Sequence, residues 1–166
     1  MRVTPDDLVV TPRGLRFRGR LFPCTRGRQG LTDDKREGDG CTPRGAHGLA
    51  GVLYRPDRLR KPTRSALPIR PRDLWSDDPA DPAYNSKVRA PHAPSHERLR
   101  RADPLYDLVL LTDWNLSPAL PGRGSAIFVH RWRRLGAPTA GCIALRPRDL
   151  LWIARRLAPR SRLVVR

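Results

Sequence analysis

The most informative stretch of this sequence reads Gly124-Ser-Ala-Ile-Phe-Val-His-Arg-Trp-Arg-Arg-Leu-Gly-Ala-Pro-Thr-Ala-Gly-Cys-Ile-Ala-Leu145. An apolar, strand-like run ends at His130, and Cys142 follows twelve residues later, directly after a glycine. A thiol beside glycine, with an imidazole that can fold back onto it, is the pair that cysteine acyl-transfer chemistry requires. We therefore take Cys142 as the candidate nucleophile and His130 as the candidate base.

The residues just before the cysteine favour this interpretation. Gly141 allows the backbone to approach a substrate closely, and the amides of Ala140, Gly141 and Cys142 are placed to converge on an oxyanion after the turn that starts at Thr139. On their own, a cysteine in an apolar run is more often a small buried hydrophobe, and a histidine at a strand end is more often structural. The pairing of the two, rather than either residue, carries the catalytic hypothesis.

Three arginines between the pair, Arg131, Arg133 and Arg134, are expected to lower the pKa of the thiol if they face it. We also expect a backbone carbonyl near Arg131 to orient the imidazole, because no acidic third partner stands out in the sequence.

Composition indicates one domain made of short strands. A chain of 166 residues is long enough for one real core and too short for two comfortable domains. Its 18 prolines and 13 glycines imply many turns and little long helix.

The net charge of +17 invites a nucleic-acid interpretation, which we place below the enzyme hypothesis. Thirty of the 33 basic residues are arginine, scattered from Arg2 to Arg166, and GC-rich codons explain much of such an excess. No zinc-finger spacing, aromatic ribonucleoprotein motif or basic zipper accompanies them. We therefore expect no specific nucleic-acid partner, while an anionic substrate or surface is compatible with the charge.

The three cysteines leave at least one thiol outside any intramolecular disulfide. Cys24 and Cys41 form either a bridge or two free thiols, and the absence of a C-x-x-C pair argues against structural zinc. No segment reaches the length of a membrane span, and residues 1–20 lack the apolar run of a secretory signal, so export is not supported by the sequence itself.

The pattern of apolar residues predicts strands and one helix. Residues 15–22 alternate between apolar and basic side chains, as a half-exposed strand does, and Pro147 with Asp149 suits the first turn of a helix. We expect strands at 8–11, 15–22, 49–54, 105–112, 126–129 and 162–166, and a helix at 147–157. Residues 56–104 show no clear periodicity and are expected to be irregular, with a binding role or partial mobility.

The other histidines offer no metal site. His92 and His96 have the i, i+4 spacing that suits a metal on a helix, but Pro91 and Pro94 make a helix there unfavourable. His47 is isolated. We expect neither a metal nor a cofactor.

The run from Gly124 to Leu145 resembles the active-site segment of YkuD-type L,D-transpeptidases, the ErfK/YbiS group. Their signature is a histidine followed by a Ser/Thr-x-Gly-Cys turn near the end of the domain, present here as His130 and Thr139-Ala140-Gly141-Cys142. Thr42-Pro43-Arg44-Gly45 is similar to the Gly/Thr-Pro-x-Gly loop of that family. The resemblance extends over about residues 15–166.

This chain departs from the better-known members in two ways. They carry histidine before the Gly-Cys pair, where this chain has Ala140, and they space the catalytic histidine and cysteine further apart. The sequence is most similar to a short-spaced branch with Pro-Thr-x-Gly-Cys. Ala140 still supplies a backbone amide, so the resemblance indicates the reaction type more strongly than the substrate.

The resemblance implies a mainly β fold, a curved β-sandwich with one C-terminal helix at about 147–157. It implies a single catalytic domain over 1–166, with its core at about 15–166 and its active-site segment at 124–145. It also implies location in the cell envelope or periplasm.

The resemblance further implies that His130 takes the proton of Cys142, which attacks a peptidoglycan stem peptide and expels the terminal D-amino acid. Thr139, Ala140, Gly141 and Arg131 would then bind the oxyanion and substrate, and an amine or water would resolve the thioester. Two alternatives are a non-catalytic wall-binding domain of the same fold and a basic nucleic-acid-binding protein.

Overall fold

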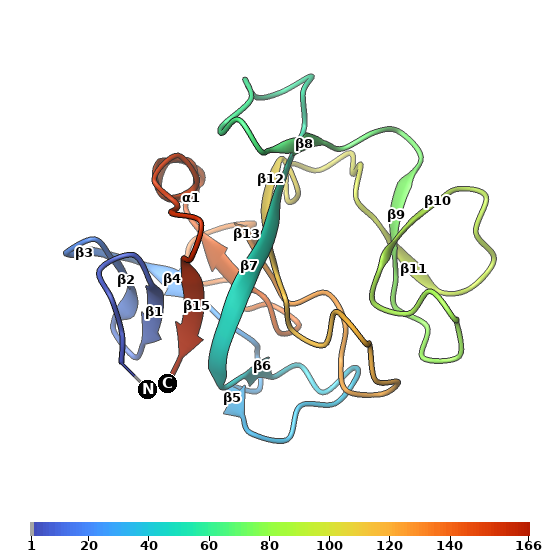
Figure 1. The fold of residues 1–166 in the computed structure, drawn as a ribbon, viewed down its shortest axis with the longest axis horizontal. Coiled ribbons are helices and arrows are strands. Elements are labelled where there is room, and N and C mark those ends of the chain that lie inside the picture. The colour runs from blue at the N-terminus through green and yellow to red at the C-terminus, as the bar shows by residue number, and fades with distance from the viewer. Residues whose placement is uncertain (1) are drawn as a thin grey trace.

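The central sheet combines strands from both ends of the chain (Figure 1). In the computed structural model, which describes residues 2–166, it has ten strands in the order β3-β2-β1-β15-β7-β12-β13-β14-β4, with β8 paired to β7. Its elements are β1 (Leu8–Thr11), β2 (Gly14–Phe17), β3 (Arg20–Phe22), β4 (Cys24–Thr25), β7 (Gly45–Tyr54), β8 (Leu67–Pro68), β12 (Leu108–Thr112), β13 (Phe128–Arg131), β14 (Ile143–Leu145) and β15 (Arg162–Val165), with helix α1 (Pro147–Ala154) packed against it.

The sheet curves until its two edges nearly meet. Its edge strands, β3 and β4, are separated in sequence by Pro23 alone. The long strand β7 joins the two halves, because its first residues pair with β15 and its last residues pair with β12. The expected mainly β architecture with one C-terminal helix is confirmed, and its curved layers belong to one continuous sheet.

Most expected strands are present, although β7 begins before residue 49, β12 begins after residue 105 and β13 is shifted from 126–129 to 128–131. Two further expectations differ more. The single strand expected at 15–22 is wrong, because Arg18 and Gly19 both adopt positive φ angles, of 47° and 74°, and turn the chain into the β2–β3 hairpin. The helix ends at Ala154 rather than at residue 157. Arg155 is the C-cap, and its amide donates to the Leu151 carbonyl oxygen.

The 56–104 segment is more ordered than expected. It contains a three-stranded sheet in the order β10-β9-β11, formed by β10 (Lys87–Arg89), β9 (Asp73–Ser76) and β11 (His96–Arg98). This small sheet lies beside the outer face of the central strands (Figure 1). A further two-stranded sheet pairs β5 (Leu31–Thr32) with β6 (Thr42–Pro43).

Alternation along the central strands divides the core into two clusters. Leu108 and Leu110 of β12 and Val129 of β13 face the inside of the curved sheet, toward α1. Val109 and Phe128 face the opposite side, where the 56–104 segment supplies Ile69, Trp75 and Leu99. The central strands are therefore buried on both faces, and the second face is the one on which Cys142 packs.

A buried ion pair ties the two ends of the chain together. Asp7 is 2% exposed and receives two hydrogen bonds from Arg162, from Nε at 3.0 Å and from Nη2 at 2.7 Å. The amide of Thr4 donates to the same carboxylate at 2.8 Å. Arg162, more than the opposing cost of burial, holds the pKa of Asp7 at about 2.

We expect Asp7→Asn to lower the free energy of unfolding by roughly 2 to 3 kcal/mol at pH 7, because it removes charge-assisted hydrogen bonds at a buried position. The folded pKa lies below the ordinary value of 3.8, so this contribution is present above pH 3.8 and is lost as the pH falls toward 2. Urea unfolding at several pH values measures it.

Asp6→Asn is the matched control, because the Asp6–Arg18 pair is exposed on both sides and should contribute little. Equal effects of the two substitutions at pH 7 would contradict the prediction.

Candidate functional site

Parallel pairing of β13 with β14 brings His130 and Cys142 to one face of the sheet. Val129 lies opposite Ile143 in the register, so Cys142 lies level with Phe128, one position before β14. Side chains alternate along a strand, and those of Phe128 and His130 therefore share a face. The Phe128 amide donates to Cys142 Sγ at 3.4 Å, which fixes the cysteine on that face.

Both candidate residues line one pocket of about 470 Å³. The turn residues Thr139 and Ala140 also line it, together with Glu97 and Arg101 of the 56–104 segment. The structure thus brings together four of the six expected site residues. Gly141 is buried behind the turn, and the Arg131 side chain points elsewhere.

His130 is held in a defined tautomer. It is 5% exposed, and its Nδ1 lies 2.7 Å from the backbone carbonyl oxygen of Arg131. A carbonyl can only accept, so Nδ1 carries the proton and Nε2 is left as the acceptor. The expected orienting carbonyl near Arg131 is thus present. Burial lowers the pKa of His130 to about 4, so the imidazole is neutral near pH 7.

Cys142 is also neutral in the resting structure. The residue retains some exposure toward the pocket, but protein surrounds its thiol, and burial raises its pKa to about 12. The nearby Glu97 carboxylate acts in the same direction. The thiol donates to the Ala126 carbonyl oxygen at 3.0 Å.

The expectation that the intervening arginines lower this pKa is wrong. Arg131 turns its guanidinium toward Asp107, at 3.5 Å. Arg133 and Arg134 are exposed. Burial and the Glu97 carboxylate dominate the pKa of the thiol, and the cation that lowers it is Lys35 rather than one of these arginines.

The Thr139 hydroxyl stabilises the turn before Cys142. Thr139 Oγ1 donates to the Cys142 carbonyl oxygen at 2.6 Å and accepts from the Gly141 amide at 3.1 Å. The Gly141 amide is therefore occupied in this structure. Gly141 has a φ of 149°, and a Cβ atom there would lie 2.8 Å from the Cys41 carbonyl oxygen, so only glycine fits.

The turn is anchored by the Thr42-Pro43 loop singled out in the sequence. Thr42 is fully buried, and its Oγ1 donates to the Gly141 carbonyl oxygen at 2.6 Å while accepting from the Gly27 amide at 2.9 Å. Backbone hydrogen bonds also join Thr139 to Arg26 and Arg28. These contacts fix the cysteine turn against the chain that leads out of β4.

Asn85 supports the other side of the cysteine, a role that the sequence did not reveal. It is 1% exposed, and its side chain forms four hydrogen bonds. Oδ1 accepts from the Ala126 amide and the Trp75 indole, and Nδ2 donates to the carbonyl oxygens of Trp114 and Asn115. Because the Ala126 carbonyl oxygen accepts the Cys142 thiol, Asn85 helps to position this thiol.

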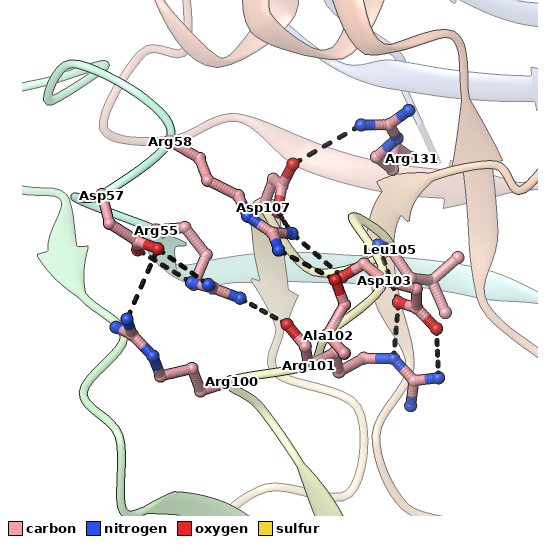
Figure 2. A network of polar contacts seen from close by, with 10 residues as sticks. All are labelled: Arg55, Asp57, Arg58, Arg100, Arg101, Ala102, Asp103, Leu105, Asp107 and Arg131. Atoms are coloured by element: carbon pink, nitrogen blue, oxygen red, sulfur yellow. Dashed lines mark hydrogen bonds and ion pairs between the residues drawn. The ribbon is translucent and has the colours of Figure 1, made fainter.

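The pocket wall formed by residues 101–107 is held by arginines (Figure 2). Arg55, only 5% exposed, donates to the Arg101 carbonyl oxygen at 2.6 Å, and Arg58 donates to the Asp103 carbonyl oxygen at 3.1 Å. Arg58 also pairs with Asp107 at 2.8 Å, while the Asp103 carboxylate accepts two hydrogen bonds from Arg101. This network fixes a loop that has no strand partners of its own.

The pocket is also lined by Glu97, Arg101 and Tyr106, which no sequence pattern predicted. Tyr106 donates to Glu97 Oε2 at 2.5 Å and packs edge-on against the His130 ring, with centroids 5.4 Å apart. No local motif marks these residues. Only the folding of the 56–104 segment over the central sheet brings them to the thiol.

The remaining histidines and cysteines lie outside the pocket. His92 pairs with Asp81 at 2.8 Å, and His47 contacts the Pro43 carbonyl oxygen. All three cysteines are free, so Cys24 and Cys41 form no bridge. Across residues 2–166, no group of three or more histidine, cysteine, aspartate or glutamate side chains is arranged to hold a metal ion. Within the same range, no helix has the length and apolar character to cross a membrane.

Comparison with known proteins agrees with the geometry of the pocket. The model of the YkuD family, described as the L,D-transpeptidase catalytic domain, matches residues 7–165. No curated protein and no solved structure gives a match. Because the family model covers nearly the whole chain, this protein belongs to the YkuD family of L,D-transpeptidase catalytic domains.

Proposed function

We propose that this protein is an L,D-transpeptidase that acts on peptidoglycan stem peptides through an acyl-enzyme on Cys142. The observation that carries the proposal is the joint position of Cys142 and His130 in one pocket, with the imidazole fixed by the Arg131 carbonyl. Membership of the YkuD family supports the same reaction class.

The first half-reaction begins with a change of hydrogen-bond partner. At rest the thiol donates to the Ala126 carbonyl oxygen, and it must turn toward His130 Nε2 to be activated. As sulfur attacks the donor carbonyl, the proton moves to Nε2, which then gives it to the departing amine of the D-amino acid. The imidazole thus serves as base and then as acid.

A preformed thiolate–imidazolium pair is unfavourable in this pocket. Burial raises the pKa of Cys142 to about 12 and lowers that of His130 to about 4, so both groups resist charging before substrate binds. The proton therefore leaves the sulfur as the sulfur–carbon bond forms, rather than in a separate earlier step.

Backbone amides of the turn stabilise the tetrahedral oxygen in this proposal. The Ala140 and Cys142 amides are the first candidates, because the Gly141 amide donates to Thr139 Oγ1 in the resting structure. The Gly141 amide joins them only if that hydroxyl turns away. An amine then resolves the thioester to a cross-link, and water resolves it to a trimmed stem.

We expect a carbapenem to form a covalent adduct with the full chain, because the Cys142 sulfur attacks the carbonyl carbon of its strained β-lactam ring. Intact-mass analysis detects the adduct. Cys142→Ser should show no adduct under the same conditions. Cys24→Ser and Cys41→Ser are matched controls that keep the adduct, since neither thiol lines the pocket.

An unmodified wild-type chain, or the same adduct in Cys142→Ser, would overturn the proposal. The first result would favour a non-catalytic wall-binding domain. Salt-sensitive binding to DNA that persists in Cys142→Ala would instead favour the nucleic-acid alternative.

Alkylation by iodoacetamide tests the neutral resting thiol. We expect the Cys142 rate to rise about tenfold per pH unit from pH 7 to 10 without levelling, because only the thiolate reacts and its pKa is raised from 9.0 to about 12. Peptide mass spectrometry assigns the rate to Cys142. A plateau near neutral pH would show that the thiolate is already formed at rest and would contradict proton loss that is concerted with attack.

A further inference from the structure

The charged side chains that line the pocket are three arginines and one glutamate. Arg28, Arg101 and Arg133 line it, and Glu97 is its single carboxylate. Arg101 is neutralised by its two hydrogen bonds to Asp103, whereas Arg28 and Arg133 are exposed and form no ion pair within the described residues. The wall thus offers two free guanidinium groups for carboxylates and one carboxylate for a cation.

Glu97 lies in β11, beside the reacting groups. It is half-buried, it accepts the Tyr106 hydroxyl at 2.5 Å, and Tyr106 packs edge-on against the His130 ring. The carboxylate is close enough to the thiol to raise the pKa of Cys142. Burial in turn raises the pKa of Glu97, which makes it a better proton acceptor than an exposed glutamate.

This position is unfavourable for the first half-reaction. A negative charge beside a thiol opposes the negative charge that sulfur must develop during attack. A benefit of Glu97 therefore has to be sought in the second half-reaction, in which the sulfur leaves and an amine attacks. A primary amine is an ammonium ion at neutral pH, and it must bind and lose a proton before it can attack.

We propose that Glu97 binds the ammonium group of the acyl acceptor and takes its proton. The inference rests on the proposed function, in which an amine resolves the thioester, and it adds the residue that binds and deprotonates this amine. One ammonium proton passes to the Glu97 carboxylate, and the free amine attacks the thioester carbon. The carbon–nitrogen bond forms, the carbon–sulfur bond breaks, and the second amine proton reaches the sulfur through His130. Glu97 then releases its proton to solvent.

A purely structural role for Glu97 makes a different prediction. In that case its function is to hold Tyr106 against His130, and only the hydrogen bond matters. Glu97→Gln separates the two roles, because the amide oxygen can still accept the Tyr106 hydroxyl while the charge is lost.

The chain provides a matched control. Its only other glutamate, Glu37, accepts the Tyr84 hydroxyl at 2.5 Å in the same manner, outside the pocket. The negative charge of Glu37 also raises the pKa of Glu97, so Glu37→Gln controls for the electrostatic effect of removing one carboxylate near the pocket.

In the experiment, the full chain receives a peptidoglycan tetrapeptide as acyl donor and one of two acyl acceptors. Glycinamide is largely an ammonium ion near neutral pH, whereas hydroxylamine is uncharged there. Mass spectrometry measures each transfer product against hydrolysis, and release of the terminal D-amino acid measures acylation. In Glu97→Gln, we expect the ratio of glycinamide transfer to hydrolysis to fall about tenfold or more. Acylation and hydroxylamine transfer should be unchanged or faster, and Glu37→Gln should behave as the wild type.

An unchanged glycinamide ratio in Glu97→Gln, or a parallel loss of glycinamide and hydroxylamine transfer, would overturn the inference in favour of a structural role. The wild type gives a second test that needs no variant: transfer to glycinamide should saturate, while transfer to hydroxylamine should stay proportional to concentration. Equal behaviour of the two acceptors would also overturn it. A wild type that releases no D-amino acid and forms no acyl-enzyme would overturn the proposed function itself, and the inference with it.

Discussion

The parallel register between β13 and β14 is the constraint on which the rest of the pocket depends. With Val129 opposite Ile143, Cys142 lies beside Phe128 and shares a face with His130. A slip of one residue would turn the cysteine toward the inner core and leave the histidine without a partner, because side chains alternate along each strand. The buried inner residues, Val129 and Ile143, oppose such a slip. The register that packs Val129 and Ile143 into the core is thus also the register that places the Cys142 thiol.

Parallel neighbours are usually joined by a helix, but here a short irregular loop makes the connection. That loop has to be held from outside, which explains the buried hydroxyl of Thr42 on the Gly141 carbonyl and the backbone bonds between Thr139 and the segment after β4. The arginine network does the same for the opposite wall (Figure 2). Several arginines of the chain are therefore used in holding loops, while most of its lysine and arginine side chains form no ion pair within residues 2–166.

The sequence predicted the features that local chemistry determines. Hydrophobic runs located β1, β12, β13 and β15, and the spacing of His130, Gly141 and Cys142 located the pocket. It failed where the outcome depends on distant parts of the chain. Arg18 gave no sign that it would take a positive φ and divide an alternating run, and Glu97 and Tyr106 reach the pocket only because a proline-rich segment folds over the outer face of the sheet. The pKa of the thiol was predicted in the wrong direction for the same reason, since adjacency in sequence does not place a guanidinium beside it.

Burial has a consequence for how such a site can work. Burial keeps both the thiol and the imidazole neutral. A neutral thiol is a weak nucleophile, so the pair reacts slowly with electrophiles until a carbonyl is positioned against it. In the proposed reaction, catalysis depends on geometry at the moment of attack: the thiol must leave the Ala126 carbonyl oxygen, and the imidazole must already present Nε2. The rigid supports around the pair, Asn85 behind Ala126 and the Arg131 carbonyl on Nδ1, are what such a mechanism needs. In the proposed mechanism, positioning of the two side chains, rather than a lowered thiol pKa, makes Cys142 reactive.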